Sequence, residues 1–232
     1  MAVNNAFLTN SYSLVLVGNP GVGKSSILNA LGGYFDTGFS MVTGLTRTLS
    51  TYETKIEGKT IRLVDLPGIF DCRADDDHTN ERHFEILHDA LSDGNPYVIF
   101  FVVSPNDGRI SPSDFTVMKA LLDSLDQSPL VGLILTKVEK EDYNDIQTSD
   151  YFAKVQEVLA QSHANLKFFS QTKPLILFRH KKRFDAIDTI RIRNYVLKFE
   201  PSQVRVRRIA VDLLRALLSV LVGVIGLVLG GA

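Results

Sequence analysis

This chain contains the segment Gly18-Asn19-Pro20-Gly21-Val22-Gly23-Lys24-Ser25 directly after the apolar run Leu14–Val17, and no other segment limits its fold as strongly. It satisfies the pattern G-x-x-x-x-G-K-[S/T], in which a strand enters a glycine loop and a helix leaves it. The glycines allow successive backbone N–H groups to face a phosphate at the positive end of the helix dipole. Lys24 is expected to reach the β- and γ-phosphates, and the Ser25 hydroxyl to coordinate Mg²⁺.

A glycine-rich turn without a ligand is the alternative interpretation of this segment. The complete order of strand, loop, Lys-Ser pair and helix argues against it, because a simple turn needs none of these neighbours. The sequence therefore predicts a site for a nucleoside triphosphate. The residues predicted to surround its phosphates are Gly18, Asn19, Pro20, Gly21, Val22, Gly23, Lys24, Ser25 and Ser26.

Length and composition set wider limits. A chain of 232 residues is expected to form one domain of ordinary size with an appendage. A formal net charge of −1 creates no strong field, so no nucleic-acid partner is expected. The single cysteine, Cys72, excludes an internal disulfide. We expect an N-terminal lead-in over residues 1–12, a nucleotide-binding domain over 13–200, and a basic linker with a hydrophobic helix over 201–232.

Apolar runs alternate with helical patterns, which is typical of an α/β fold. They predict the three-layer P-loop fold, with a mainly parallel six-stranded sheet and helices on both faces. Glu57-Gly58-Lys59-Thr60 is a predicted tight turn that joins the one antiparallel pair, and Ser111-Pro112-Ser113-Asp114 is a predicted helix start. The predicted strands lie near Ser13–Val17, Leu49–Ile56, Thr60–Val64, Tyr97–Val103, Leu130–Thr136 and Pro174–Phe178. The predicted helices lie near Lys24–Leu31, Asn80–Ser92, Ser113–Leu125, Thr148–Ser162 and Phe184–Lys198.

A second motif, Asp65-Leu66-Pro67-Gly68, comes at the end of the strand predicted over Thr60–Val64. In a P-loop fold, an acid at this position holds Mg²⁺, often through water, and the glycine offers its N–H to the γ-phosphate. Asp65 and Gly68 are therefore predicted to face the phosphates. A strand-ending Asp-Pro-Gly turn is the structural alternative.

Three threonines, Thr43, Thr46 and Thr48, lie between the two motifs, where a threonine that senses Mg²⁺ and the γ-phosphate is expected. We select Thr46, although a threonine in a polar loop often serves only a turn. The predicted Mg²⁺ ligands are Ser25, Thr46 and Asp65.

Base recognition is predicted at Thr136-Lys137-Val138-Glu139, where guanine-binding proteins carry Asn/Thr-Lys-x-Asp. The acid accepts hydrogen bonds from the guanine N1–H and exocyclic amine, and the lysine stem lies along the ring. A carboxylate rejects adenine because the buried charge loses its donors. Glu139 is one methylene longer than the usual aspartate, so the geometry must adjust. A charged helix start, Glu139-Lys140-Glu141-Asp142, is the alternative interpretation.

Several segments together make the chain resemble the immunity-associated GTPase family, of the septin-like and chloroplast-import-receptor branch of P-loop GTPases. They are Leu14–Ser25, Asp65-Leu66-Pro67-Gly68-Ile69-Phe70-Asp71, Gly108-Arg109-Ile110-Ser111 and Thr136-Lys137-Val138-Glu139. The similarity covers roughly Ser13 to Lys198. It implies a guanine-nucleotide switch that binds GTP, GDP and Mg²⁺ and forms a homodimer through its nucleotide face, often on intracellular membranes. Phe178-Arg179-His180 stands where relatives commonly have Phe-Asn-Asn, which makes Arg179 and His180 the predicted last base contacts.

Slow hydrolysis is predicted because no glutamine follows the second motif. Many fast GTPases orient the attacking water with a glutamine two residues after the motif glycine, whereas here Ile69 and Phe70 follow Gly68. Arg109 is a candidate to supply positive charge from the facing protomer, although an arginine before a helix is commonly a solvated surface residue. The predicted catalytic residues are Lys24, Thr46, Gly68 and Arg109.

The C-terminal segment Ala216–Ala232 contains 17 residues and none of them is charged. As a helix it would be about 25 Å long, which is short for a bilayer core of about 30 Å. A helix buried on the domain, or one lying in the membrane interface, is the alternative. We predict a tail anchor, with the upstream arginines keeping the domain on the cytosolic side of an intracellular membrane.

The sequence thus predicts a GTP-binding switch that hydrolyses GTP slowly and dimerises at an intracellular membrane according to its nucleotide. A GTP-dependent membrane scaffold without significant hydrolysis remains open, and so does a P-loop ATPase, because the base motif departs from the usual pattern.

Overall fold

The computed structural model describes residues 11–37, 49–68, 78–125, 131–160, 173–179 and 184–203, and the account below concerns these residues. Within them, one six-stranded sheet has the order β2-β3-β1-β4-β5-β6. The strands are β1 (Ser11–Val17), β2 (Ser50–Ile56), β3 (Lys59–Asp65), β4 (Tyr97–Val103), β5 (Val131–Val138) and β6 (Leu175–Phe178). The helices are α1 (Lys24–Ala30), α2 (His78–Leu91), α3 (Pro112–Ser124), α4 (Tyr143–Ile146), α5 (Ser149–Ala160) and α6 (Ala186–Val196).

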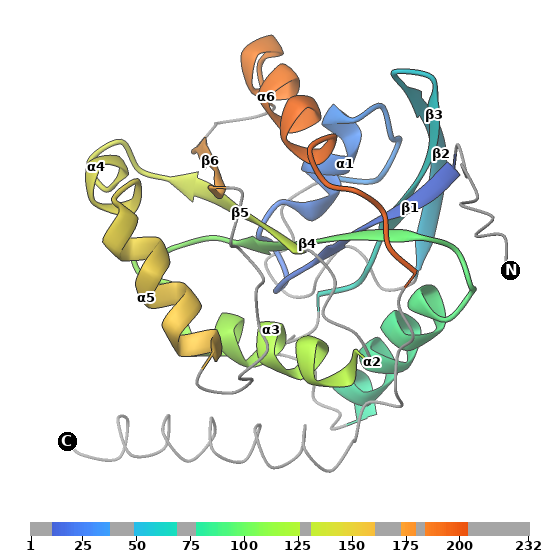
Figure 1. The fold of residues 1–232 in the computed structure, drawn as a ribbon, viewed down its shortest axis with the longest axis horizontal. Helices are drawn as coiled ribbons and strands as arrows, with labels where there is room; N and C mark the ends of the chain where they lie inside the picture. The colour runs from blue at the N-terminus through green and yellow to red at the C-terminus, as the bar shows by residue number, and fades with distance from the viewer. Residues whose placement is uncertain are drawn as a thin grey trace, which may run out of the picture.

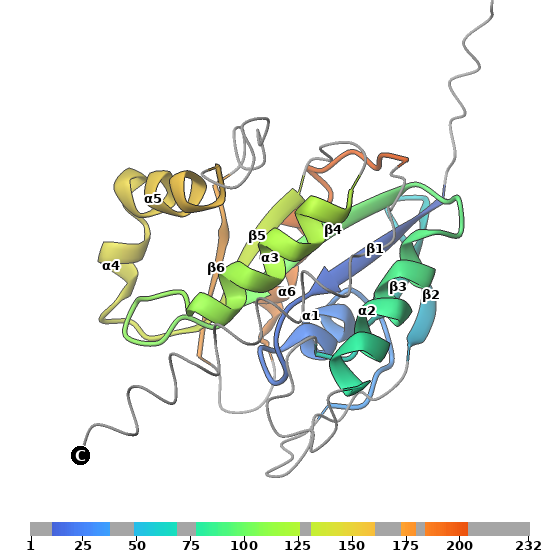
Figure 2. The ribbon, with the colours of Figure 1, turned by 90° about the horizontal axis from the view of Figure 1, so that it is seen from below.

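Two helical layers enclose the sheet. Figure 1 shows α1 and α6 on one side of it, with α2, α3 and α5 on the other, and Figure 2 shows α2 and α3 in front of the sheet when it is seen from below. The β2–β3 pair is antiparallel, and the other described pairs are parallel. This arrangement confirms the predicted three-layer α/β fold with a mainly parallel six-stranded sheet.

Each central strand contributes to two cores, because successive side chains of a strand point to opposite faces. In β1, Val15 and Val17 pack with residues of α2 and α3, whereas Leu14 and Leu16 pack with residues of α1 and α6. Every residue of β4 is buried, as expected for a parallel strand covered on both faces. The sheet is therefore a rigid base whose strand ends position the loops of the site.

One predicted turn and one predicted helix start are confirmed. Glu57 and Gly58 between β2 and β3 have φ values of 49° and 77°, and a two-residue hairpin with positive φ at both positions matches the twist of its strands. Ser111 caps α3, because its side chain accepts a hydrogen bond from the backbone N–H of Asp114 and Pro112 begins the helix.

Two elements differ from the predictions. Strand β5 continues to Val138 rather than ending at Thr136, because its pairing with β6 resumes beyond an irregularity between Leu135 and Val138. The single-turn helix α4 was not predicted, since one turn is too short to carry a periodic apolar pattern.

The predicted C-terminal hydrophobic helix lies outside the described residues, and so do residues 1–10 of the predicted lead-in. Among the helices that are described, none is both long and apolar enough to cross a membrane. The boundaries 1–12, 13–200 and 201–232 stay predictions.

Candidate nucleotide-binding site

Residues 18–23, hereafter the phosphate loop, connect the end of β1 to the start of α1 (Figure 1). Gly21 and Gly23 have φ values of 76° and 98°, a backbone region that glycine adopts without strain. A Cβ atom on Gly18 would lie 2.2 Å from the carbonyl oxygen of Val102 in β4, so glycine is required for this close approach. Ser26, also predicted near the phosphates, is half-buried in the first turn of α1.

Lys24 is held inside the phosphate loop. Its Nζ donates hydrogen bonds to the carbonyl oxygens of Gly18 at 3.0 Å and Asn19 at 3.1 Å. An ammonium has three N–H donors, so one remains to bind a phosphate oxygen. Burial lowers the pKa of Lys24 to about 8, against the opposing charge of Asp65. The side chain is therefore mostly charged at neutral pH, and an incoming phosphate would favour that form further.

Two of the predicted Mg²⁺ ligands meet directly. The Ser25 hydroxyl at the start of α1 donates a hydrogen bond of 2.7 Å to Oδ2 of Asp65, which ends β3 and is buried. A hydroxyl and a carboxylate are hard oxygen donors, and Mg²⁺ is commonly bound by one or two such groups together with phosphate oxygens and water. The pair therefore fits Mg²⁺. Within the described residues, no larger cluster of acidic, histidine or cysteine side chains could hold a metal.

The second motif contacts the phosphate loop through Gly68. A Cβ atom at this residue would lie 2.4 Å from the backbone nitrogen of Pro20, so the segment after β3 passes the loop at a distance that only glycine permits. Thr46, the predicted sensor of Mg²⁺ and the γ-phosphate, lies outside the described residues.

The predicted base motif is tied to the phosphate loop by its first two side chains. The Thr136 hydroxyl is buried and bonds the carbonyl oxygens of Val22 at 2.6 Å and Val103 at 3.2 Å. Nζ of Lys137 donates to the carbonyl oxygen of Gly21 at 2.6 Å. Burial lowers the pKa of Lys137, and the positive charge of Arg179 adds to the effect. Thr136 thus braces the loop with a hydroxyl that is already engaged, while Lys137 can lay its stem along a base.

Glu139, the predicted base-recognising acid, forms an ion pair with Arg179. Oε1 of Glu139 lies 2.5 Å from Nε of Arg179, and both side chains are at least half exposed. Arg179 also donates its backbone N–H to the carbonyl oxygen of Val138. An exposed ion pair contributes about 0–1 kcal/mol, so a guanine base could replace it at Glu139 at little cost. His180 lies outside the described residues.

Arg109 stands exposed on a tight turn beside the phosphate loop. Asn106 and Arg109 exchange two backbone hydrogen bonds of 2.9 Å, and Asp107 and Gly108 between them have φ values of 48° and 70°. A cleft of about 330 Å³ joins this turn to the loop. Its lining residues include Asn19, Pro20, Gly21, Arg109, Asp114 and Lys137.

Sequence reasoning missed one group in this cleft. Asn19 was expected to contribute only as a member of the loop, and Asp114 only as part of a helix start. Nδ2 of Asn19 instead donates a hydrogen bond of 2.7 Å to Oδ1 of Asp114, across 95 residues of sequence. The Ser-Pro-Ser-Asp helix start was the visible signal, but nothing in it indicates a partner so distant along the chain.

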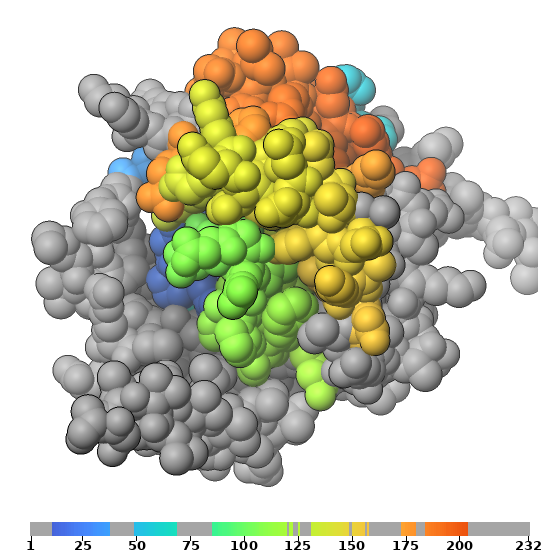
Figure 3. All heavy atoms as spheres, turned by 90° about the vertical axis from the view of Figure 1, so that its left-hand side faces the viewer, coloured from blue at the N-terminus to red at the C-terminus, as the bar shows by residue number. Residues whose placement is uncertain are grey.

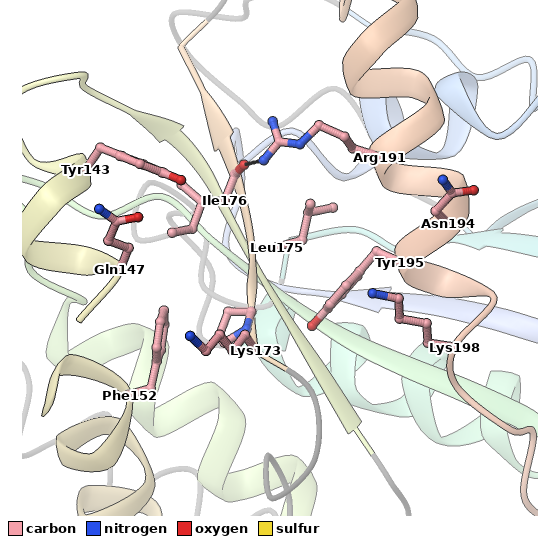
Figure 4. Close-up of a pocket in the computed structure, with 11 residues that line it drawn as sticks. Tyr143, Gln147, Phe152, Lys173, Leu175, Ile176, Arg191, Asn194, Tyr195 and Lys198 are labelled. Atoms are coloured by element: carbon pink, nitrogen blue, oxygen red, sulfur yellow. Dashed lines mark hydrogen bonds between the residues drawn. The ribbon is translucent and has the colours of Figure 1, made fainter. Parts of the chain in front are cut away.

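A second cleft, of about 390 Å³, lies at the β6 edge of the sheet. Figure 3 shows this face, where α4 and α5 in yellow lie beside α6 in orange. Figure 4 shows side chains from α4, α5 and α6 around β6, with Arg191 donating to the carbonyl oxygen of Ile176 at 2.7 Å. Lys173 and Lys198 also line it. The cleft contains no residue predicted to bind phosphate or base, and we assign it no part in nucleotide binding.

Comparison with known proteins agrees with this geometry. The family model for 50S ribosome-binding GTPases matches residues 13–137, more than half of the chain. GTPase Der of Campylobacter lari is 30% identical over 135 residues, which are 56% of this chain and 26% of that protein. The tRNA modification GTPase MnmE of Hydrogenovibrio crunogenus is 24% identical over 198 residues, which are 81% of this chain and 42% of that protein. The chain thus spans less than half the length of these curated relatives.

Solved structures share the fold. Toc33 from Arabidopsis thaliana, in complex with Mg²⁺ and GMPPNP, has a TM-score of 0.61 at 17% identity and covers 86% of this chain and 89% of its own. Era from Aquifex aeolicus, bound to GDP and AlF₄⁻, has a TM-score of 0.52 at 21% identity and covers 89% of this chain and 64% of its own. At such identities the likeness shows the fold alone. The phosphate loop, the Ser25–Asp65 pair and the family match over residues 13–137 together establish that this chain belongs to the P-loop GTPase family described as 50S ribosome-binding GTPases.

Proposed function

We propose that this chain is a guanine-nucleotide switch that hydrolyses GTP slowly alone and faster as a homodimer joined through its nucleotide faces. The observation that carries this proposal is the exposed Arg109 turn beside the phosphate loop. An arginine at the rim of one site is placed to reach a second site that faces it. In such a pair, each Arg109 would complete the catalytic site of the other protomer.

The chemistry of phosphoryl transfer explains why a second protomer would matter. Negative charge spreads over the γ-phosphate oxygens in the transition state, and positive groups around it lower the barrier. Lys24 provides one such group, and Ser25 with Asp65 would hold the Mg²⁺ that neutralises the phosphates. The residues after Gly68 are Ile69 and Phe70, whose side chains have no amide group to orient water. A guanidinium from the partner would supply the missing charge.

Two solved structures with a similar fold support the proposed role of dimerisation. One solved structure with a TM-score of 0.56 is described by the finding that dimerisation is important for the GTPase activity of atToc33 and psToc159. Another, at a TM-score of 0.59, is a dimerisation-deficient Toc33 mutant in which an arginine is replaced by alanine. We propose that this chain belongs to the branch of P-loop GTPases that contains chloroplast-import receptors and immunity-associated GTPases. The reason is that several of its segments resemble the immunity-associated family.

Turnover per protomer, measured over a wide range of protein concentration, tests the proposal. We expect it to rise with concentration, and Arg109→Ala to remove the rise without weakening the binding of a fluorescent GDP analogue. Arg193→Ala is the matched control, because Arg193 is also exposed but lies on α6. Negligible turnover at every concentration would favour the scaffold without hydrolysis.

Guanine selectivity rests on the Glu139 carboxylate, which can accept two hydrogen bonds from guanine once Arg179 is displaced. Parallel titrations with fluorescent GDP and ADP analogues test it. Tighter binding of the ADP analogue would contradict guanine selectivity and favour the alternative that the chain is a P-loop ATPase.

We also propose that residues 216–232 anchor the chain to an intracellular membrane with the GTPase domain facing the cytosol. The support is the uncharged 17-residue segment and the arginines that precede it. Expressed in cells, the full chain should resist carbonate extraction from membranes, whereas a chain that lacks residues 216–232 should be released. Equal extraction of the two forms would contradict the anchor.

A further inference from the structure

A polar network connects the phosphate loop to the first turn of α3. Nδ2 of Asn19 donates to Oδ1 of Asp114 at 2.7 Å, and the Ser111 hydroxyl donates to Oδ2 of Asp114 at 2.7 Å. The backbone N–H of Asp114 in turn donates to the Ser111 hydroxyl at 3.2 Å. Both oxygens of the Asp114 carboxylate are thus engaged, one within its own helix and one by the phosphate loop.

The Asp114 carboxylate is buried, with 5% of the residue exposed. Burial raises its pKa, and the hydrogen bonds from Ser111 and Asn19 oppose that effect. A buried acid near a loop that binds phosphates brings no electrostatic advantage to phosphate binding, because the two charges repel. Its position is explained by geometry instead. A buried carboxylate has to keep its donors, which makes the distance between Asn19 and α3 costly to change.

The network lies between the phosphate loop and Arg109. Ser111 follows Arg109 by two residues, and the turn that carries Arg109 is closed by its own backbone hydrogen bonds with Asn106. Asn19 belongs to the loop at the other end, where its carbonyl oxygen accepts a hydrogen bond from Nζ of Lys24. Asn19 therefore contacts both Lys24 and Asp114, the acid five residues after Arg109.

We propose that Asp114 is a positioning residue, which holds the Arg109 turn against the phosphate loop through Asn19 so that Arg109 can act on the nucleotide of a second protomer. This inference rests on the proposed dimeric function and adds the element that sets the position of the arginine. Asp114 itself does not touch the nucleotide in this scheme. Its removal should therefore lower the turnover of the dimer more than that of the single protomer.

Three variants of the full chain test the role of Asp114. Asp114→Ala removes the acceptor for Asn19, and it should lower turnover at high protein concentration about tenfold or more, because small displacements of a catalytic group are costly. Turnover at low concentration and the affinity for a fluorescent GDP analogue should fall by a smaller factor, because a single protomer does not use Arg109 in this scheme. Asp114→Asn keeps an acceptor oxygen for Asn19 and should restore the stimulation. Thr116→Ala, which removes a solvent-exposed hydrogen bond to the carbonyl oxygen of Pro112 on the same helix, is the control for altered helix stability.

Amide hydrogen exchange of residues 104–116 provides a readout that does not depend on dimerisation. Asp114→Ala should speed the exchange of the Asn106 and Arg109 amides, whereas Asp114→Asn and Arg109→Ala should leave it unchanged. Unaltered exchange in Asp114→Ala would overturn the positioning role, and so would an equal loss of turnover at low and high concentration. If the unmodified chain lacks concentration-dependent turnover, the dimeric function fails and the catalytic part of this inference fails with it. The exchange rates then still decide whether Asp114 holds the turn.

Discussion

Replacing Lys24 by methionine should stabilise the nucleotide-free chain while strongly weakening nucleotide binding. Lys24 is 7% exposed, and burial lowers the pKa of its ammonium from 10.5 to about 8. Because one pKa unit corresponds to about 1.4 kcal/mol, keeping this ammonium charged in the folded chain costs about 3 kcal/mol. Methionine is an unbranched side chain without charge, so it can occupy the same space without that cost.

The hydrogen bonds of Lys24 reduce the expected gain. Methionine leaves the carbonyl oxygens of Gly18 and Asn19 without their ammonium donor, at about 1 kcal/mol each. The free energy of unfolding should therefore rise by about 1 kcal/mol, which corresponds to an increase in Tm of about 2–4 °C for a domain of this size. Affinity for a fluorescent GDP analogue should fall about 100-fold or more, because a charge-assisted bond to phosphate is lost.

The pH dependence gives the sharper measurement. Below about pH 8, Lys24 is charged in both the folded and the unfolded chain, and the cost is present in full. Between about pH 8 and pH 10.5 the folded chain releases this proton while the unfolded chain keeps it, so the wild-type chain gains stability relative to the variant. Urea unfolding of both nucleotide-free proteins at pH 7 and at pH 10 measures the difference. A variant less stable at pH 7, or a stability gap of unchanged size at pH 10, would refute this reasoning.

Three further predictions concern the base, the metal and the core. Glu139→Gln should weaken the binding of GDP about tenfold and the binding of xanthosine diphosphate by less, because the glutamine amide can donate to the carbonyl that replaces the guanine amine. Equal losses of affinity for the two nucleotides in a titration would contradict this role of Glu139. Asp65→Asn should weaken GTP binding by about tenfold in the presence of Mg²⁺ and have little effect in excess EDTA. An equal loss of affinity in both conditions would show that Asp65 does not act through Mg²⁺. Gly132→Ala places a Cβ atom 2.3 Å from the Phe100 ring, so it should lower the free energy of unfolding by about 1–3 kcal/mol, measured by urea unfolding. Unchanged stability would mean that the ring can move aside.

Local sequence patterns predicted the sheet and the phosphate end of the site. The apolar run that becomes β4 matched its observed bounds, because a strand buried on both faces has an unbroken apolar sequence. The Lys24–Ser25 pair and Asp65 were predicted from motifs whose residues are close in sequence or end a strand. These signals are short in range, and the physical requirement for each can be stated residue by residue.

Other parts of the site could not be predicted, because they depend on residues that only the fold brings together. The Thr136 hydroxyl braces Val22 across 114 residues, and no local pattern distinguishes that brace from a base contact. The ion pair between Glu139 and Arg179 joins the ends of β5 and β6, and it sets what a base must displace. Sequence spacing carries no information on such pairs.

The P-loop fold and the residues predicted to hold the phosphates follow from the amino-acid sequence, because glycine conformations, a lysine and an apolar strand act locally. The links between Lys24, Asn19 and Asp114 exist only in the folded chain, where the Arg109 turn and the phosphate loop line one cleft. The physical reason is burial. A buried ammonium and a buried carboxylate must find hydrogen-bond partners, and which partners lie within reach depends on how the loops at the strand ends pack together.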